Sequence, residues 1–102
     1  MMHSKDAYKP LIVRIGHALS CIALNNSYVI CGDNTGNIYA IDAVTGLLAF
    51  KQKMAEYGII SIHSFQNHLF IQPKIKHISI WDFAKDKYIL LYDILDLSLI
   101  HI

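Results

Sequence analysis

The chain contains few of the residues on which several functional classes depend. Charged residues make up 17% of the 102 residues, and 9 basic side chains stand against 8 acidic ones, which leaves no electrostatic footprint for nucleic acid. Two cysteines, Cys21 and Cys31, are too few for a secreted disulfide framework or a zinc site. No GxSxG sequence surrounds Ser20, Ser27 or Ser61. We therefore expect a protein that is not an enzyme, does not bind nucleic acid and uses no metal or cofactor.

Long uninterrupted apolar runs are also missing. The run LIVRI near the start is short and broken by Arg14, and the polar opening MMHSKDAYKP does not have the pattern of a signal peptide. The longest apolar stretch, YILLYDILDLSLIHI, contains Asp93 and Asp96, which makes it a poor membrane span. We expect an intracellular protein, cytoplasmic or nuclear, without a membrane partner.

Apolar residues are abundant instead, at 54% of the chain. This fraction is above the usual range for soluble domains, and the length leaves room for one small domain. Such a chain is expected to bury most of its segments on more than one side.

The sequence repeats itself with a period of 40 residues. Few positions are identical, but apolar runs and breaks recur at the same places, and NNS at 25–27 falls on FQN at 65–67 without an insertion. The shift places Val29 on Leu69, Ile30 on Phe70, Ile38 on Ile78, Ile41 on Trp81 and Asp42 on Asp82.

Each copy consists of short runs rich in β-branched and aromatic residues, separated by turn formers. The first copy contains LSCIAL, YVIC, NIYAID and LLAFKQ, and the second contains IISIHS, HLFIQ, HISIWD and KYILLY. Apolar residues do not keep a helical spacing over three turns anywhere. Four strands per copy, at intervals of about ten residues, predict an all-β fold.

The stretch GDNTG at 32–36 could be a ligand loop or a tight turn. A phosphate loop would be followed by a helix, whereas the strand-like NIYAID follows here. A calcium loop would need more oxygen ligands than Asp33, Thr35 and Asn37, and a late bidentate Glu. We expect a turn in which Gly36 takes a positive φ.

These features together resemble the WD-repeat family of β-propellers. IWD at 80–82 closes the third strand of the second copy, and GH at 16–17 stands where the family carries its Gly-His pair. CGDNTGNIYAID at 31–42 follows the family's turn and third strand, with Ile41 where Trp is usual. The resemblance covers roughly residues 16–93. It identifies as structural repeat positions Gly16, His17, Gly36, Asp42, Trp81 and Asp82.

The resemblance implies two consecutive four-stranded antiparallel blades, which form an incomplete propeller. A closed ring takes about 4–8 blades, so we expect a fragment, a truncated product or a protomer that completes a ring with others. The implied function is a non-catalytic scaffold for binding other proteins, with self-association through open blade faces. The expected segments are 1–15 with the outer strand of a preceding blade, 16–53 and 54–93 as the two blades, and 94–102 as the start of a further blade.

Both copies depart from the family at one point. The family often links a His, a Ser or Thr, an Asp and the Trp by hydrogen bonds inside one blade, and here His17 and Trp81 remain, one in each copy. We therefore expect both blades to depend on apolar packing. The other positions hold Cys31, Thr35 and Ile41 in the first copy and Tyr57, Ile71 and Ile75 in the second.

A narrower likeness and a competing one both come from longer stretches. GDNTGNIYAID and LFIQPKIKHISIWDF resemble the ASTRA-complex WD-repeat subunits and their G-protein-β-like relatives, which are thought of as scaffolds in kinase maturation, although QPKIK departs from their turn. GNIYAIDAVTGLLAFKQK instead resembles the repeats of quinoprotein-like (PQQ-type) propeller enzymes and assembly factors. The second copy favours the first interpretation, because it keeps the WD pair and has no Thr-Gly.

Other chemistry-bearing residues have structural interpretations that we prefer. Cys21 and Cys31 lie equally far from Asn26, so a three-residue hairpin loop would set them opposite each other, as a disulfide or as two buried thiols, and we expect the thiols. Asp42 and Asp82 are expected to accept hydrogen bonds from turn N–H groups. His63, His68 and His77 fall on three successive strands, and Trp81 is expected between the blades. Open blade faces are expected to expose Ile22, Leu24, Ile60 and Ile62.

Overall fold

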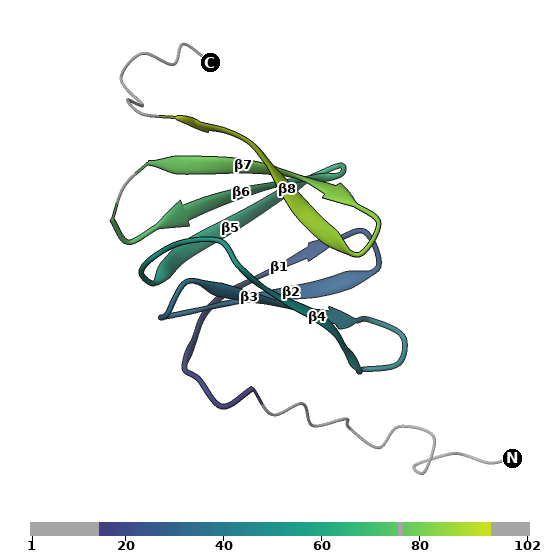
Figure 1. The fold of residues 1–102 in the computed structure, drawn as a ribbon. Helices are drawn as coiled ribbons and strands as arrows, with labels where there is room; N and C mark the ends of the chain where they lie inside the picture. Colours follow the sequence, from purple (N-terminus) through teal and green to yellow (C-terminus); the bar gives the residue numbers. More distant parts are fainter. Residues whose placement is uncertain (1–14, 76, 95–102) are drawn as a thin grey trace, which may run out of the picture.

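The computed structural model describes residues 15–75 and 77–94, which form two four-stranded antiparallel sheets (Figure 1). The described residues contain no helix, and therefore none that is long and apolar enough to cross a membrane. The first sheet consists of β1 (Leu19–Asn25), β2 (Tyr28–Asp33), β3 (Asn37–Asp42) and β4 (Leu48–Lys53). The second consists of β5 (Ile59–Phe65), β6 (His68–Pro73), β7 (Ile78–Ala84) and β8 (Lys87–Ile94).

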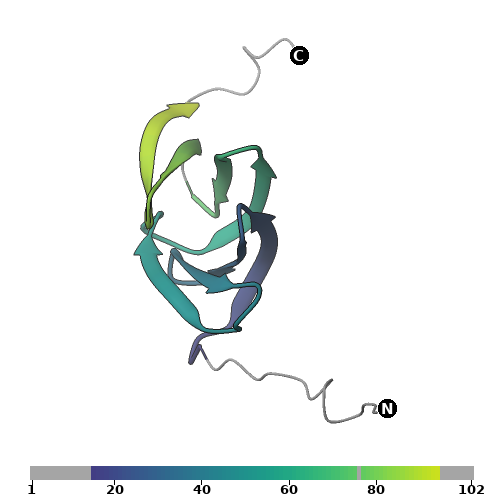
Figure 2. The ribbon, with the colours of Figure 1, turned by 90° about the vertical axis from the view of Figure 1, so that its right-hand side faces the viewer.

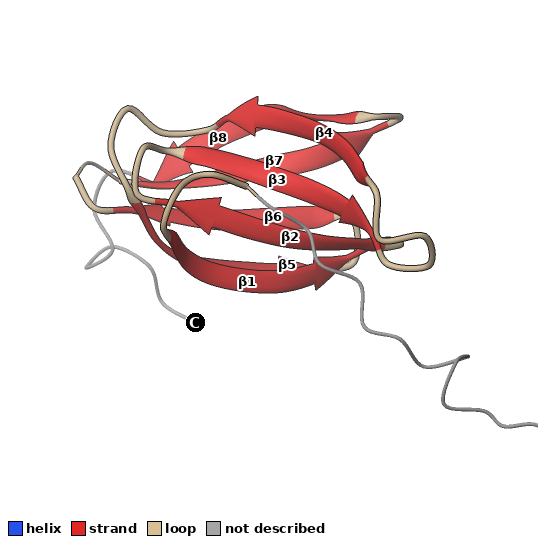
Figure 3. Ribbon diagram, turned by 90° about the horizontal axis from the view of Figure 1, so that it is seen from below, coloured by secondary structure: helices blue, strands red, loops and turns tan. Residues whose placement is uncertain are grey.

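Each sheet is a simple meander in which every strand pairs with the next one along the chain. The two sheets are stacked face to face (Figure 2), and the strands run in order from β1 and β5 at one edge to β4 and β8 at the other (Figure 3). This arrangement confirms the predicted all-β fold of two four-stranded antiparallel units. The expected outer strand of a preceding blade and most of the start of a further blade lie outside the described residues, whereas Ile94 still belongs to β8.

The 40-residue repeat of the sequence is also a repeat of the backbone. The first hairpin of each sheet turns through a residue with positive φ, Asn26 (56°) and Gln66 (53°). The pairing register also shifts at equivalent places in both sheets, between residues 19 and 21 and again between 59 and 61, then at 40/41 and again at 80/81. The two copies therefore share these bulges as well as their strands. The last hairpin differs: Ile41 pairs with Leu48 but Trp81 pairs with Leu90, so equivalent positions on β4 and β8 lie 42 residues apart.

One of these bulges corrects the expected set of open-face residues. Ile60 is 52% exposed, as expected, but Ile62 is only 6% exposed and packs in the core. The extra residue between Ile59 and Ser61 breaks the strict alternation of β5, so Ile59 and Ile62 both point to the buried side. Simple period-two counting cannot detect such a shift.

The hydrophobic core lies between the two sheets. It combines aliphatic side chains of both sheets, among them Ile30 and Ile38 from the first and Leu69 and Ile71 from the second, all of which are fully buried. An aromatic group extends this core, with ring centroids 5.2–6.4 Å apart. Its members are Tyr28 and Phe50 from the first sheet and Phe83 and Tyr88 from the second.

Two amides of the first sheet hold the second sheet in register. Asn25 is 2% exposed; its Nδ2 donates to Ser64 Oγ (2.7 Å), and its Oδ1 accepts from the Tyr88 hydroxyl (2.5 Å). Gln52 donates to the Tyr88 carbonyl (2.7 Å) and accepts from the Tyr88 N–H (2.8 Å). These bonds satisfy polar groups that the contact between the sheets would otherwise leave without water.

The two cysteines are free thiols on opposite faces of the first sheet. The β1–β2 hairpin has a two-residue turn, which pairs Cys21 with Gly32 and Cys31 with Ile22. The three-residue loop that would have set the cysteines opposite each other is therefore wrong. Alternation along the strands then points the two thiols to different sides of the sheet.

The turn between β2 and β3 is a structural turn, as predicted, and it is docked against the chain that leads into the second sheet. Gly36 has a φ of +99°, and its carbonyl accepts from the N–H groups of Met54 (2.8 Å) and Ala55 (3.1 Å). A Cβ added to Gly36 would lie 2.0 Å from the carbonyl oxygen of Ala55.

We expect Gly36→Ala to destabilise the protein by about 3 kcal/mol or more, because backbone strain and a backbone clash add together. Gly16→Ala is the matched control: Gly16 has a φ of +89° with nothing within 4 Å of an added Cβ, so the substitution should cost only about 1 kcal/mol. Urea unfolding midpoints of the two variants and the parent measure the difference. Equal losses would show that the docking of this turn contributes nothing.

Candidate functional site

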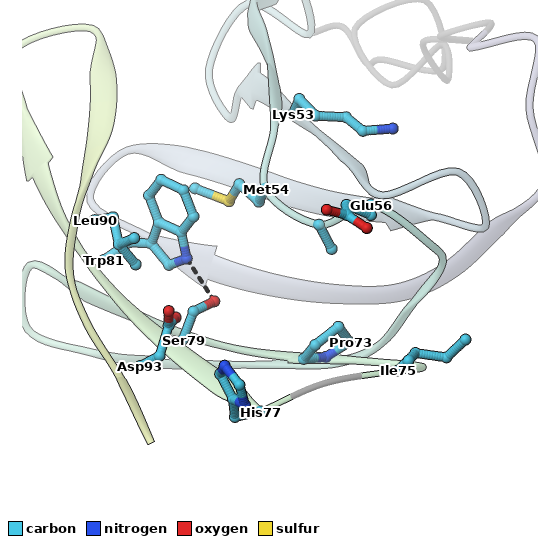
Figure 4. Close-up of a pocket in the computed structure, with 11 residues that line it drawn as sticks. Lys53, Met54, Glu56, Pro73, Ile75, His77, Ser79, Trp81, Leu90 and Asp93 are labelled. Atoms are coloured by element: carbon cyan, nitrogen blue, oxygen red, sulfur yellow. Dashed lines mark hydrogen bonds between the residues drawn. The ribbon is translucent and has the colours of Figure 1, made fainter. Parts of the chain in front are cut away.

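A pocket of about 350 Å³ opens between the two sheets (Figure 4). The first sheet contributes the end of β4 and the connection to β5, and the second contributes the end of β6 and parts of β7 and β8. The walls are mostly apolar, with a few polar groups among them. The lining residues are Lys53, Met54, Ala55, Glu56, Pro73, Ile75, His77, Ser79, Trp81, Leu90 and Asp93.

Trp81 forms one wall of this pocket. Residues 79 and 81 alternate along β7, so their side chains share the face that looks toward the first sheet, and His77, just before the strand, also lines the pocket. The indole N–H donates to Ser79 Oγ at 2.8 Å, and Ser79 is 6% exposed (Figure 4). Trp81 lies between the sheets, as expected, but it is only half-buried because one side of the ring lines the pocket.

The charged groups at the pocket do not form a reactive arrangement. The Lys53 ammonium is turned away from the pocket (Figure 4) and donates to the Thr35 carbonyl at 2.7 Å. Asp93 pairs with Ser79 across β7 and β8 and lies at the rim, where it is exposed. Among residues 15–75 and 77–94, no group of three His, Cys, Asp or Glu side chains is placed to hold a metal ion. The pocket thus offers a mostly apolar surface on which Glu56, His77, Ser79 and Asp93 are the remaining polar groups.

The predicted repeat positions are spread over the molecule, and Trp81 is the member that lines the pocket. Gly16 has positive φ, and both Gly16 and His17 are exposed just before β1. Asp42 Oδ1 accepts from the N–H groups of Val44 (2.8 Å) and Thr45 (2.9 Å), the turn role that we expected. Asp82 instead lies 4.0 Å from the ring nitrogen of His68.

A second polar centre lies around Asp33, a fully buried residue at the end of β2, where the turn to β3 begins. Its Oδ1 accepts from the Thr35 hydroxyl (2.8 Å) and from the N–H groups of Thr35 and Asn37 (both 2.9 Å). Its Oδ2 accepts from the Tyr39 hydroxyl (2.7 Å). The expectation that the first blade depends on apolar packing alone is therefore wrong.

The environment of Asp33 sets its protonation. Burial by itself would raise the pKa of this carboxyl group, but the hydrogen bonds from Tyr39, Asn37 and Thr35 outweigh burial and lower the pKa to about 2. Burial, together with the hydrogen bond to Asp33 and its negative charge, raises the pKa of Tyr39 to about 12. Lys51 completes this group, because its ammonium nitrogen lies 5.6 Å from the centre of the Tyr39 ring.

The two centres differ in how far the sequence could have revealed them. Asp33 begins DNTGNIY, in which N–H groups two and four residues later are within reach of an Asp side chain, so a local turn signal was present. The partner Tyr39 becomes visible only when the alternation of β3 is combined with the turn. The pocket has no such signal, because its walls come from both sheets.

No family model matches the chain, and no curated protein matches it. Solved structures do match. The β-propeller domain of Myceliophteria thermophila Cps50 (Swd1) is 16% identical, with a TM-score of 0.72 over 81% of this chain and 30% of that chain. The computationally designed Ika4 protein is 17% identical, with a TM-score of 0.64 over 74% of this chain and 47% of that chain. The designed Ika8 protein is 18% identical, with a TM-score of 0.61 over 70% of this chain and 22% of that chain.

These likenesses show the fold of the chain. At 16–18% identity, what is shared is the arrangement of strands, which is that of part of a β-propeller, and each sheet is one blade. The chain spans less than half the length of each of these proteins.

We expect Asp33→Asn to destabilise the protein by about 2 kcal/mol near neutral pH, because four charge-assisted hydrogen bonds are weakened. The lowered pKa means that the stabilisation is complete above about pH 4 and is lost as the pH falls toward about 2. The difference in free energy of unfolding between the parent and the variant, measured by urea unfolding, should therefore be smaller at about pH 3 than at about pH 7. Asp86→Asn, at an exposed turn residue, should leave no such gap. A gap that is constant with pH would contradict this role of Asp33.

Proposed function

We propose that the chain is a non-catalytic β-propeller unit that binds other proteins, with the inter-blade pocket as the place where a partner's side chain is anchored. The observation that supports this proposal is the pocket itself: half-buried Trp81 stands in a mostly apolar cavity of about 350 Å³ that is open to solvent. Pockets for small ligand groups start at about 300 Å³ and combine apolar walls with a few polar groups.

An apolar side chain of a partner is the occupant that fits these walls. Met54 and Leu90 offer aliphatic surface beside the indole, and Pro73 lines the pocket further from it (Figure 4). The Ser79 hydroxyl, which accepts from the indole N–H, is a polar group on the same wall. Aromatic residues in partly enclosed pockets are enriched among the residues that contribute most to binding between proteins.

The proposed location of the protein is intracellular, in the cytoplasm or the nucleus.

Two other interpretations of the sequence were the ASTRA-complex WD-repeat group and the quinoprotein-like propellers. Membership of the ASTRA-complex WD-repeat group remains a proposal, since no family model or curated protein supports it. The quinoprotein-like alternative is not favoured, because the solved structure with the TM-score of 0.72 is the propeller domain of Cps50 (Swd1). We therefore propose a scaffold function without enzymatic activity.

The test is a selection of peptides from a random display library on the 102-residue chain, followed by titration of the selected peptides. Trp81 is the single tryptophan of the chain, so its fluorescence reports occupancy of the pocket directly. We expect the bound peptides to share an apolar anchor residue and to change the emission of Trp81.

Leu90→Glu should weaken these peptides about tenfold or more, because it places a charge on the apolar wall. Val44→Glu is the matched control: Val44 is 86% exposed in the turn between β3 and β4, away from the pocket, and its substitution should leave the affinity unchanged. Peptides that bind Leu90→Glu as tightly as the parent, or that leave Trp81 emission unchanged, would contradict a pocket-centred function.

A further inference from the structure

The contact between the two blades can be described as one row of side chains packed against another. On the inner face of the first blade, the row crosses all four strands in register, and on the inner face of the second blade an equivalent row does the same. The first row is Ala23, Ile30, Ala40 and Phe50, and the second is Ser64, Leu69, Trp81 and Leu90.

Each blade carries a second row on its outer face, which is the face that points away from the other blade. Within the described residues, no further blade covers either outer face. On the first blade this outer row is Leu24, Val29, Ile41 and Leu48, and on the second it is His63, Phe70, Ile80 and Tyr92. Leu24 is 68% exposed and Tyr92 57%, and the flanking Ile22 and Phe65 are 67% and 64% exposed. Both outer faces therefore expose apolar side chains, although Ile80 is 2% exposed and Val29, Ile41 and Phe70 are half-buried.

The repeat makes these two outer rows the two halves of one contact. The outer row of the first blade occupies the positions that, one repeat later, pack inward as the row containing Leu69 and Trp81. The outer row of the second blade occupies the positions that, one repeat earlier, pack inward as the row containing Ile30 and Phe50. One chain thus displays at its two ends the strand positions that are equivalent to the two packed rows in its middle.

The inner and outer contacts use different combinations of side-chain sizes. At the inner contact, one row contains the two alanines Ala23 and Ala40, and the other contains Trp81. The outer rows contain neither the alanines nor a tryptophan: medium aliphatic residues on the first blade would meet Phe70 and Tyr92 of the second.

The two amides that bridge the blades at the inner contact are replaced by apolar residues on the outer face of the second blade. Asn25 and Gln52 bond to the second blade at the inner contact. Asn25 corresponds one repeat later to Phe65, and Gln52, which pairs with Ile38, corresponds by strand pairing to Ile94, which pairs with Ile78. At these two positions an outer contact has no amide to satisfy, and exposed apolar surface marks an interaction site.

We propose that a second copy of this chain covers each open face, with the outer face of the second blade of one copy packed on the outer face of the first blade of the next. Such a contact is heterologous, so it either closes into a ring or continues as a filament. Rings of about 4–8 blades are the stable closed form, which corresponds to roughly two to four copies of a two-blade chain. The inference does not depend on the proposed function, because the pocket lies within each copy.

The test is the molar mass of the chain in solution, measured by size-exclusion chromatography with light scattering. We expect a discrete assembly of roughly two to four times 11.6 kDa. Leu24→Glu blocks the outer face of the first blade, and Tyr92→Glu blocks that of the second; either variant alone should lose the assembly. Val44→Glu, at an exposed turn position off both faces, should assemble like the parent.

Mixing the two blocked variants separates this model from nonspecific association and from misfolding. Each variant retains the face that the other has lost, so an equimolar mixture should form a dimer of one copy of each, held by a single intact contact. The double variant should remain a monomer with the circular dichroism of the β fold. A parent chain that is monomeric at high concentration, or a mixture that forms no heterodimer, would overturn the proposal.

Discussion

The packing of one blade on the other is the interaction on which everything else in this molecule depends. A four-stranded sheet with an apolar face is not stable in water until another layer covers that face. Here Ile30 and Ile38 on one side and Leu69 and Ile71 on the other exclude water from each other, and four aromatic rings extend the contact. Asn25 and Gln52 then fix its register through bonds that alternative packings would break.

The pocket is a consequence of this contact. The first strands of the two blades, β1 and β5, lie against each other, whereas the last strands, β4 and β8, touch at few positions. A space therefore remains between the blades near β4 and β8. Trp81 lies at the boundary, with one side packed on the core and the other facing this space. A side chain that is held on one side and accessible on the other offers a fixed apolar surface to whatever enters the space.

The Asp33 group shows a different way of holding a small apolar domain together. A fully buried carboxylate is costly unless donors surround it, and here two hydroxyl groups and two N–H groups do so. The bonds shape the turn that carries Gly36, and Gly36 in turn receives the chain that leads into the second blade. A local polar cluster thereby helps to place one blade relative to the next.

The strands and their count were predictable, because period-two alternation, turn formers and a 40-residue repeat are local or periodic signals. The turn at Gly36 and the turn role of Asp42 were predictable for the same reason. The bulge that buries Ile62 was not, since it depends on pairing across strands, and neither was the two-residue turn that separates the cysteines.

The sequence by itself determined that this chain forms two similar four-strand units without helices, because backbone conformation follows from patterns within about ten residues. Tertiary structure alone decided which face of each unit is inner and which is outer. It also decided that Trp81 opens onto a cavity and that Tyr39 meets a buried Asp33. These outcomes depend on side chains that are distant in the sequence or on opposite sides of a turn, and their contacts exist only once the sheets have twisted and stacked.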